Sequence, residues 1–362
     1  MSEVEEILQT IKPAVRDLRA YSLSPHRASV KINQNENPWE IPESVKAETL
    51  RRLDARRWSR YPDFVASSLQ ESLAEFASWK PDGVIAGNGS NELIQSLLMV
   101  TVNEAKQVLI SEPTFALYRQ VTRVLGGEIV SVPLTSTFQF DVNALTEAVQ
   151  NSKPEVVILC SPNNPTGSLI EDTDLRQLLR TAPGLVVIDE AYHEFADHSV
   201  VPLLNDFHNL VVLRTFSKAM GLAGMRVGYL LAAPQLVTEI RKAVLPYNLN
   251  VFSQTVAEVA VEVYEQELMP RVKAIIGERE RLFVQLKAIE GLDPISSKAN
   301  FMIVRTAMEP RKLFGGLLER DILVRDVSGY PMLKNYFRFN VGTPKENDQL
   351  INALKEIMSW SH

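Results

Sequence analysis

The chain has 362 residues, of which 45% are hydrophobic and 23% are charged, the composition of a globular protein long enough for one large α/β domain and a smaller one. Its net charge of −6, without a basic block, argues against a nucleic-acid partner. A single cysteine, Cys160, excludes a disulfide framework and a thiolate metal site, and the absence of a signal peptide or an apolar run of membrane-spanning length predicts a cytoplasmic protein with no membrane partner.

Residues 1–40 are expected to form an arm. Residues 4–11 favour a short helix and residues 30–32 a short strand, but this segment has too few apolar side chains for a core of its own. We therefore expect the arm to pack on the small domain and on a dimer partner. A helix over 43–55 then leads to Arg60-Tyr61-Pro62-Asp63, a turn that could present Tyr61 outward.

Residues 41–260 are predicted to form the large domain. Short apolar strands alternate there with helix-sized connections, which is typical of a mostly parallel, doubly wound α/β sheet. Residues 84–94 are expected to form a strand, a glycine turn and the start of a helix. Further strands are expected at 107–110, 128–132, 155–160, 185–188, 210–213 and 227–232. Helices are expected at 66–78, 114–125, 141–150 and 171–181.

Residues 261–362 are predicted to form the smaller α+β domain. A long helical stretch over 255–290, broken near Pro270, leads into it; strands are expected at 301–304, 323–325 and 336–340, with helices at 310–319 and 345–359. Arg325 and Arg338 lie on or beside these strands. An arginine on a strand is often a solvated residue, but two near one site suit a carboxylate or a phosphate.

Polar residues directly follow three strands of the large domain. Asn164, Asp189 and Lys218 each come shortly after a buried strand, where ligands of doubly wound sheets bind. A buried Asp189 would need a cation, such as a protonated ring nitrogen, although a helix N-cap would also explain it. Asn164 could equally serve turn chemistry.

Lys218 stands alone among small and apolar residues. Desolvation there would lower its pKa and make the amine a nucleophile, whereas the simpler alternative is a surface lysine that opens a helix. Thr215, Ser217 and Arg226 suit a phosphate beside that amine, and the helix start after Gly89 could bind an anion. A nucleophilic lysine beside a phosphate site is what pyridoxal phosphate requires.

Taken together, these motifs resemble those of the fold-type I, pyridoxal-phosphate-dependent aminotransferases over nearly the whole chain. In chain order they are Asn88-Gly89-Ser90, Asn164-Pro165-Thr166-Gly167, Asp189-Glu190-Ala191-Tyr192, Ser217-Lys218 with Arg226, and Arg338-Phe339-Asn340-Val341-Gly342. The segments Gln34 to Pro38, Arg60-Tyr61-Pro62 and Leu222 to Arg226 make the chain most similar to the histidinol-phosphate aminotransferase subgroup.

The resemblance implies a role for each motif residue and no metal. Lys218 would bond covalently to the cofactor and move the proton at the substrate carbon, Asp189 would hold the pyridine nitrogen, and Tyr192 and Asn164 would bind the ring oxygen. Phe115 would stack on the ring. The cofactor phosphate would contact Gly89, Ser90, Asn91, Thr215, Ser217 and Arg226, and also Tyr61, which reaches the neighbouring subunit of a homodimer; the substrates would contact Tyr21, Asn37, Arg325 and Arg338.

The implied reaction is ping-pong transamination. Glutamate would give its amino group and leave as 2-oxoglutarate, and imidazole acetol phosphate would become L-histidinol phosphate in histidine biosynthesis. An aromatic amino-acid aminotransferase of the same subgroup and, less readily, a threonine-phosphate decarboxylase are the alternatives. A catalytically silent regulator is disfavoured, because Lys218, Asp189, Asn164 and Arg226 are all present.

Overall fold

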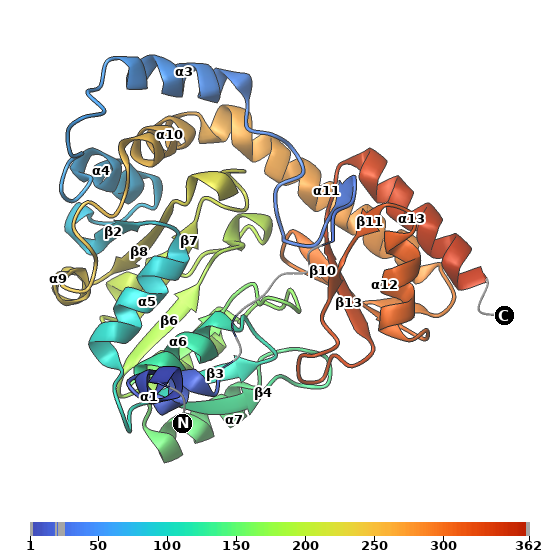
Figure 1. Cartoon of the computed structure of the whole chain (residues 1–362), viewed down its shortest axis with the longest axis horizontal. Helices are drawn as coiled ribbons and strands as arrows, with labels where there is room; N and C mark the ends of the chain where they lie inside the picture. Colours follow the sequence, from blue (N-terminus) through green and yellow to red (C-terminus); the bar gives the residue numbers. More distant parts are fainter. Residues whose placement is uncertain (1–2, 19, 21–25, 360–362) are drawn as a thin grey trace.

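A computed structural model describes residues 3–18, 20 and 26–359, so Tyr21 lies outside the described residues. Its largest element is a seven-stranded sheet in the order β2-β8-β7-β6-β5-β3-β4 (Figure 1). The strands are β2 (Val84–Gly87), β3 (Gln107–Glu112), β4 (Glu128–Pro133), β5 (Val156–Cys160), β6 (Leu185–Asp189), β7 (Leu210–Thr215) and β8 (Gly228–Ala232). Only β8 runs opposite to the other six strands of this sheet, which confirms the prediction of a mostly parallel sheet.

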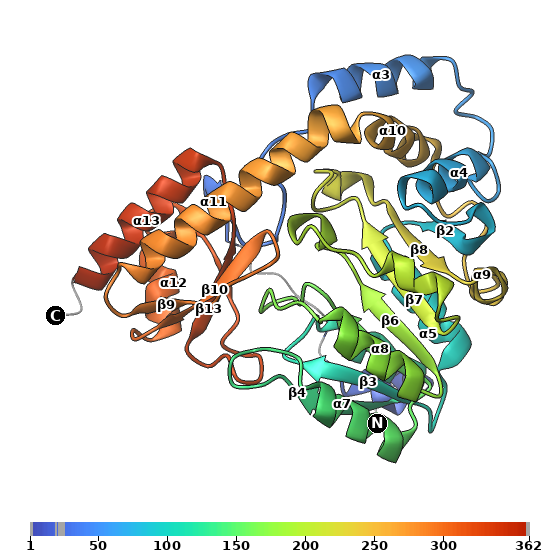
Figure 2. The same cartoon turned by 180° about the vertical axis from the view of Figure 1, so that it is seen from behind.

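Both faces of this sheet are buried, which is why its strands read as continuous apolar runs. In β5, Val156 and Ile158 pack into one core, whereas Val157 and Leu159 pack into the other. Helices α5 (Ser90–Thr101) and α6 (Leu117–Leu125) cover the first face, and α7 (Val142–Ser152) and α8 (Asp172–Thr181) cover the second (Figures 1 and 2). The sheet is therefore doubly wound.

A smaller antiparallel sheet, in the order β12-β13-β10-β9, lies beside the large one (Figure 1). Its strands are β9 (Leu292–Pro294), β10 (Phe301–Thr306), β12 (Arg325–Asp326) and β13 (Tyr336–Asn340), and it is accompanied by α12 (Pro310–Leu318) and α13 (Pro344–Ser359). Helix α10 (Val251–Glu262), a π-helical turn at Tyr264–Leu268 and α11 (Met269–Lys287) connect the two sheets along the back of the molecule (Figure 2).

The N-terminal segment runs over both parts. It begins with α1 (Glu3–Leu8) and α2 (Pro13–Arg16), and α2 packs near α6. Strand β1 (Val30–Lys31) then pairs in parallel with β11 (Ile322–Leu323) of the C-terminal part. Two further helices, α3 (Glu43–Asp54) and α4 (Ser67–Phe76), pack against α10.

Several expectations need correction. Helix α9 (Pro234–Arg241) and strand β9 were not predicted, the expected strand 323–325 is divided between β11 and β12, and the helix expected from 114 begins at Leu117. The predicted break at Glu267 to Pro270 overlaps the π-helical turn at Tyr264–Leu268, and Pro270 lies in the first turn of α11, where proline is tolerated. Among the described residues, no helix is long and apolar enough to cross a membrane, and no cluster of His, Cys, Asp or Glu could hold a metal.

Candidate active site

A cavity of about 310 Å³ lies where β5, β6 and β7 end. Because the carboxyl ends of parallel strands share one edge of a sheet, side chains that are far apart in sequence meet there. The sequence-predicted residues that line it are Ser90, Asn91, Phe115, Asn164, Asp189, Tyr192, Thr215, Ser217, Lys218, Arg226, Arg325 and Arg338.

Lys218 follows β7 in a turn, so the alternative of a surface lysine that opens a helix is wrong. Its Nζ donates to the backbone carbonyl of Gln34 at 3.2 Å and lies 5.9 Å from the centre of the Tyr192 ring. Burial, with a smaller contribution from the positive charge of Arg338, lowers the pKa of Lys218 from 10.5 to about 8. The amine is therefore largely available as a nucleophile or base at mildly alkaline pH.

Asp189 is the last residue of β6 and is almost completely buried. Its Oδ2 accepts a hydrogen bond from the Tyr118 hydroxyl at 2.6 Å, and its Oδ1 accepts one from the Ala191 amide at 3.1 Å. The nearest helical turn, His193–Phe195, is preceded by Tyr192, so Asp189 is not a helix N-cap. Burial raises the pKa of Asp189 from 3.8 to about 6, as expected of a carboxylate that forms no ion pair with any residue that the structure describes.

The Tyr192 hydroxyl joins the two parts of the molecule. It accepts hydrogen bonds from Asn35 Nδ2 at 3.0 Å and from Asn164 Nδ2 at 3.3 Å. Arg338 in turn donates to Asn164 Oδ1 at 2.6 Å and to the backbone carbonyl of Asn33 at 2.9 Å. Since a hydroxyl has one donor and two acceptor positions, Tyr192 keeps its own proton for a ligand oxygen.

An anion cradle lies at the start of α5. Gly89 has a φ of +80°, which favours glycine, and a Cβ built on it would lie 2.6 Å from Arg226 Nη2 and would displace this guanidinium. Arg226 Nη1 donates to Ser217 Oγ at 3.3 Å, and Thr215 Oγ1 lies 3.0 Å from the same hydroxyl. A helix N-terminus, a guanidinium and two hydroxyls are a donor set that suits a phosphate.

Two predicted residues lie elsewhere. Tyr61 is 82% exposed and stacks on Tyr247, with 4.5 Å between ring centres. Asn37 is absent from the lining of the cavity, and its Nδ2 donates to the backbone carbonyl of Ala219 at 3.1 Å. It also approaches the carbonyl of Lys218 at 3.4 Å, so it contacts the turn that carries Lys218 rather than the cavity. The predicted roles of both residues, like those of the lining residues, stay predictions.

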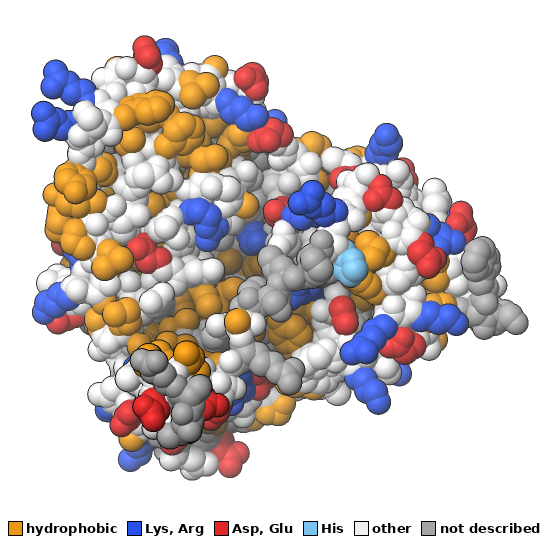
Figure 3. Space-filling view, viewed as in Figure 1, with side chains coloured by type: hydrophobic (Ala, Val, Ile, Leu, Met, Phe, Trp, Pro, Cys, Tyr) orange, Lys and Arg blue, Asp and Glu red, His pale blue; other side chains and the backbone are white. Residues whose placement is uncertain are grey.

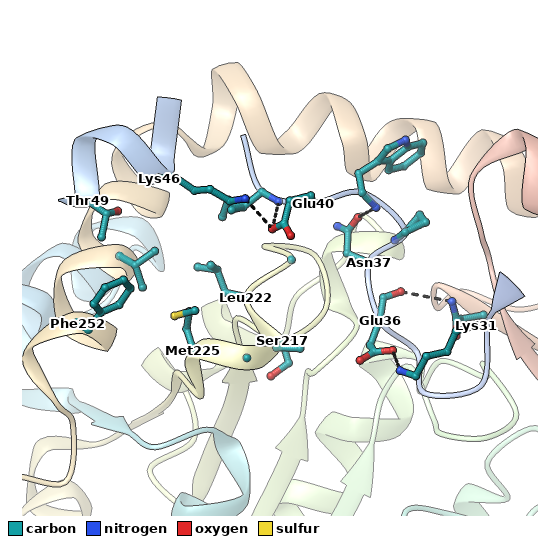
Figure 4. Close-up of a pocket in the computed structure, with 18 of the residues that line it drawn as sticks. Lys31, Glu36, Asn37, Glu40, Lys46, Thr49, Ser217, Leu222, Met225 and Phe252 are labelled. Carbon is teal, nitrogen blue, oxygen red and sulfur yellow. Dashed lines mark hydrogen bonds and ion pairs between the residues drawn. The ribbon is translucent and has the colours of Figure 1, made fainter. Parts of the chain in front are cut away.

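A second cavity, of about 760 Å³, adjoins the first (Figure 4). Figure 4 shows Leu222, Met225 and Phe252 on one side of it and Glu36, paired with Lys31, on the other. Glu36 and Ser217 line both cavities. The second cavity, which Asn37 also lines, is the larger and more apolar of the two, and it lacks the titratable pair of Lys218 and Asp189.

Sequence reasoning assigned no role to two side chains of this network, those of Tyr118 and Asn35. Tyr118 follows Phe115 by three positions, a spacing at which side chains near a helix start lie side by side, so the sequence carried a weak signal for it. Asn35, with a φ of 56°, is set by contacts with Asn340 and Asn300, which no local pattern reveals.

Known aminotransferases are similar to this chain in sequence and in fold. The family model for aminotransferases of class I and II matches residues 28–354. The histidinol-phosphate aminotransferase of Chlorobium limicola is 38% identical over 354 residues, which are 97% of this chain and 99% of that protein, and the enzyme of the same name from Chlorobium phaeobacteroides is 39% identical over 97% of both chains. The structure of a histidinol-phosphate aminotransferase from Sinorhizobium meliloti in complex with pyridoxal-5'-phosphate has the same fold, with a TM-score of 0.87, 24% identity and coverage of 97% of this chain and 98% of that one.

Proposed function

The chain belongs to the class I and II aminotransferases and is a pyridoxal-phosphate-dependent transaminase, and on this premise we propose that its substrate is histidinol phosphate. The overall reaction transfers the amino group of glutamate to imidazole acetol phosphate, which yields 2-oxoglutarate and L-histidinol phosphate. The proposal is supported by the curated relatives of that name and by the charges that line the cavity.

The residues present fit the cofactor. Pyridoxal phosphate, when bound, supplies a carbonyl that takes up an amino group and a protonated ring that withdraws electrons from the substrate carbon. Lys218 would hold it covalently, and Asp189, which is buried and forms no ion pair within the described part of the chain, would accept the ring N–H. Tyr192 and Asn164 would hold the ring oxygen, Phe115 would stack on the ring, and the cradle of Gly89, Ser90, Asn91, Thr215, Ser217 and Arg226 would hold the phosphate.

Lys218 would also act as the general base. Its depressed pKa increases the fraction of neutral amine, which can remove the proton from the substrate Cα and return a proton in the opposite half-reaction. The Tyr192 ring lies beside that amine, with 5.9 Å between Nζ and the ring centre, and its hydroxyl would donate its proton to a ligand oxygen. Arg338 is held by Asn164 and by the Asn33 carbonyl, so its guanidinium is fixed to receive a substrate anion.

One observation carries the choice of substrate. Arg325 of β12 and Arg338 of β13 are direct partners in the antiparallel register, and both line the cavity that contains Lys218. The cradle at Arg226 would hold the cofactor phosphate, so Arg325 and Arg338 provide a separate anion site. That site suits a substrate that carries its own phosphate, since a guanidinium accepts carboxylate and phosphate alike. Two guanidinium groups suit the doubly charged phosphate of histidinol phosphate, which has no carboxylate, whereas the single carboxylate of an aromatic amino acid needs only one of them.

The test is an absorbance titration of the cofactor-loaded protein with L-histidinol phosphate and, separately, with phenylalanine. The lysine-bound cofactor absorbs in the visible, and the band bleaches when the amino group is taken up. We expect bleaching at far lower concentrations of histidinol phosphate. An equal or reversed preference would assign the chain to the aromatic aminotransferases, and a visible band that persists in Lys218→Ala would contradict the role of Lys218.

The same titration tests Arg325. Because a hydrogen bond to a charged group contributes about 1.5–3 kcal/mol, Arg325→Gln should weaken histidinol phosphate binding roughly 10- to 100-fold. Arg305→Gln, on strand β10 of the same sheet but outside the cavity, is the matched control and should leave the titration unchanged. Equal binding by the wild type and Arg325→Gln would contradict the second anion site.

We also propose that the protein is a cytoplasmic homodimer in which Tyr61 reaches the phosphate of the neighbouring subunit. Tyr61 and Phe64 are both exposed and contact Tyr247, so aromatic side chains gather outside the protein's own active cavity. Figure 3 shows apolar side chains on the face that carries α3 and α4, which is the kind of surface that a second subunit covers.

The domain division proposed from the sequence has support as well. The seven-stranded sheet falls within 41–260 and the four-stranded sheet within 261–362, although residue 260 lies inside α10. The arm, residues 1–40, contributes β1 to the C-terminal part through its pairing with β11.

A further inference from the structure

Tyr118 is the side chain on which this inference depends. It lies in α6 and is fully buried, and its ring packs edge-on against Phe115, with 5.6 Å between ring centres. Phe115 lines the active cavity, whereas Tyr118 does not. The Tyr118 hydroxyl lies 2.6 Å from Asp189 Oδ2, a distance typical of a strong hydrogen bond to a carboxylate.

The direction of this hydrogen bond is determined by burial. Desolvation raises the pKa of Tyr118 well above its usual value, so the proton stays on the phenol and the hydroxyl donates. The Ala191 amide donates to the other oxygen, Oδ1. Each carboxylate oxygen therefore has one protein donor, and its remaining lone pairs are available to a ligand in the cavity, which Asp189 lines.

The other titratable groups around Asp189 do not replace Tyr118. Burial raises the pKa of the Cys160 thiol well above its usual value, so the thiol stays neutral. Glu190 is engaged by Arg214, whose Nε donates to it at 2.9 Å. Lys218 is the remaining charged group near Asp189, and its Nζ donates to Gln34. Within the described residues, Tyr118 is the only side chain that donates a hydrogen bond to Asp189.

We propose that Tyr118 is a positioning residue that keeps the Asp189 carboxylate ionised and oriented as the acceptor for the protonated ring nitrogen of the cofactor. The inference rests on the family's cofactor and not on the choice of substrate. Without the hydroxyl, the carboxylate would hold a proton more tightly and draw the ring proton toward itself. The ring would then carry less positive charge. Because that charge disfavours protonation of the nitrogen through which Lys218 holds the cofactor, this nitrogen would keep its proton to higher pH.

The test is a pH titration of the visible absorption band in cofactor-loaded Tyr118→Phe, which keeps the buried ring and loses only the hydroxyl. We expect the pKa of the band to rise by about one unit and kcat to fall about tenfold, the size expected for one hydrogen bond to a carboxylate, with KM changed less than about twofold. Tyr264→Phe, a buried tyrosine outside the cavity, is the matched control and should titrate as the wild type does.

Two further measurements separate positioning from packing. In an Asp189→Asn background, Tyr118→Phe should no longer move the band, because the residue through which it acts is already neutral. Replacement of Tyr118 by 3-fluorotyrosine, a stronger donor of nearly the same shape, should lower the pKa of the band and keeps the test available if Tyr118→Phe does not fold. The proposal would be overturned if the band titrated as in the wild type in Tyr118→Phe or in the 3-fluorotyrosine variant. It would also be overturned if Tyr118→Phe shifted the pKa of the band equally in the wild-type and Asp189→Asn backgrounds. A preference for phenylalanine would instead contradict the proposed substrate and would leave this titration unaffected.

Discussion

At the scale of single residues, burial displaces the pKa values of Lys218 and Asp189 toward each other. The pKa of Lys218 falls to about 8 and the pKa of Asp189 rises to about 6, because burial disfavours the charged form of each side chain. Pairs of groups displaced in this way are typical of active sites. In this protein they occupy the ends of adjacent strands, β6 and β7, so one cofactor could contact both.

The displaced pKa of Lys218 predicts how the stability of the cofactor-free protein depends on pH. Between about 8 and 10.5 the unfolded chain holds one more proton at this lysine than the folded chain does, so the free energy of unfolding rises with pH by at most about 1.4 kcal/mol per unit. Lys218→Met removes this contribution. Urea unfolding at pH 8 and at pH 10 should show a steeper rise for the wild type than for the variant.

The control for that measurement is Lys242→Met. Lys242 is exposed and paired with Glu239, so its removal should leave the pH dependence unchanged. For Asp189 the sign is opposite: from about pH 4 to pH 6 the folded chain holds the extra proton, and the free energy of unfolding falls as pH rises. A difference between wild type and Lys218→Met that is the same at pH 8 and pH 10 would contradict the buried state of the lysine.

At the scale of elements, the cradle depends on how closely α5 approaches Arg226. Gly89→Ala would place a Cβ against the guanidinium at a φ of +80°, which alanine rarely adopts. We expect the affinity for pyridoxal phosphate, measured by equilibrium dialysis, to fall roughly tenfold, which is the effect of about 1.4 kcal/mol. The free energy of unfolding of the cofactor-free protein should fall by about 1–3 kcal/mol.

Gly277→Ala provides the comparison. Gly277 lies in α11, and a Cβ there meets nothing within 4 Å, so this change should stabilise the helix by about 0.5–1 kcal/mol and leave cofactor affinity unchanged. If Gly89→Ala bound the cofactor as tightly as Gly277→Ala, the cradle would not be the phosphate site.

Segment 33–36 of the arm is a second element that contributes to the site. Asn340 of β13 accepts from the Asn35 amide and Asn300 donates to the Asn35 carbonyl, so the C-terminal part holds this segment. The segment in turn contacts Tyr192 through Asn35 and Lys218 through Gln34. The turn that carries Lys218, after a strand of the large sheet, is thereby connected to the small sheet.

At the scale of the whole molecule, the proposed exchange of Tyr61 between subunits predicts complementation. Lys218→Ala and Tyr61→Ala should each be strongly impaired alone. After the two are unfolded and refolded together, a mixed dimer would combine an intact Lys218 and an intact Tyr61 at one of its two sites, so about a quarter of wild-type activity should return.

The control for this experiment pairs Lys218→Ala with Asp189→Ala. Both residues lie in the same cavity of one chain, but each mixed site would still lack one of them, so no activity should return. Absence of recovery in the Tyr61 pair, with dimers confirmed by light scattering, would show that Tyr61 does not serve the neighbouring site.

Local patterns in the sequence were sufficient for the strands of the large sheet and for the residues that follow them. Continuous apolar runs such as Val156–Cys160 predict buried parallel strands, and residues after such strands must meet at one edge, which is why Asn164, Asp189 and Lys218 were expected together. The glycine and hydroxyl residues of the cradle could be found for the same reason, because their chemistry lies in short motifs.

Only the tertiary structure decided the contacts that orient these residues. The antiparallel direction of β8, the register that sets Arg325 opposite Arg338, and the hydrogen bond from Tyr118 to Asp189 across 71 positions all join segments that are distant in sequence. No local pattern encodes such contacts, since they depend on how whole elements pack. The sequence therefore determined which chemical groups the site contains, and packing determined which hydrogen bonds hold each of them in place.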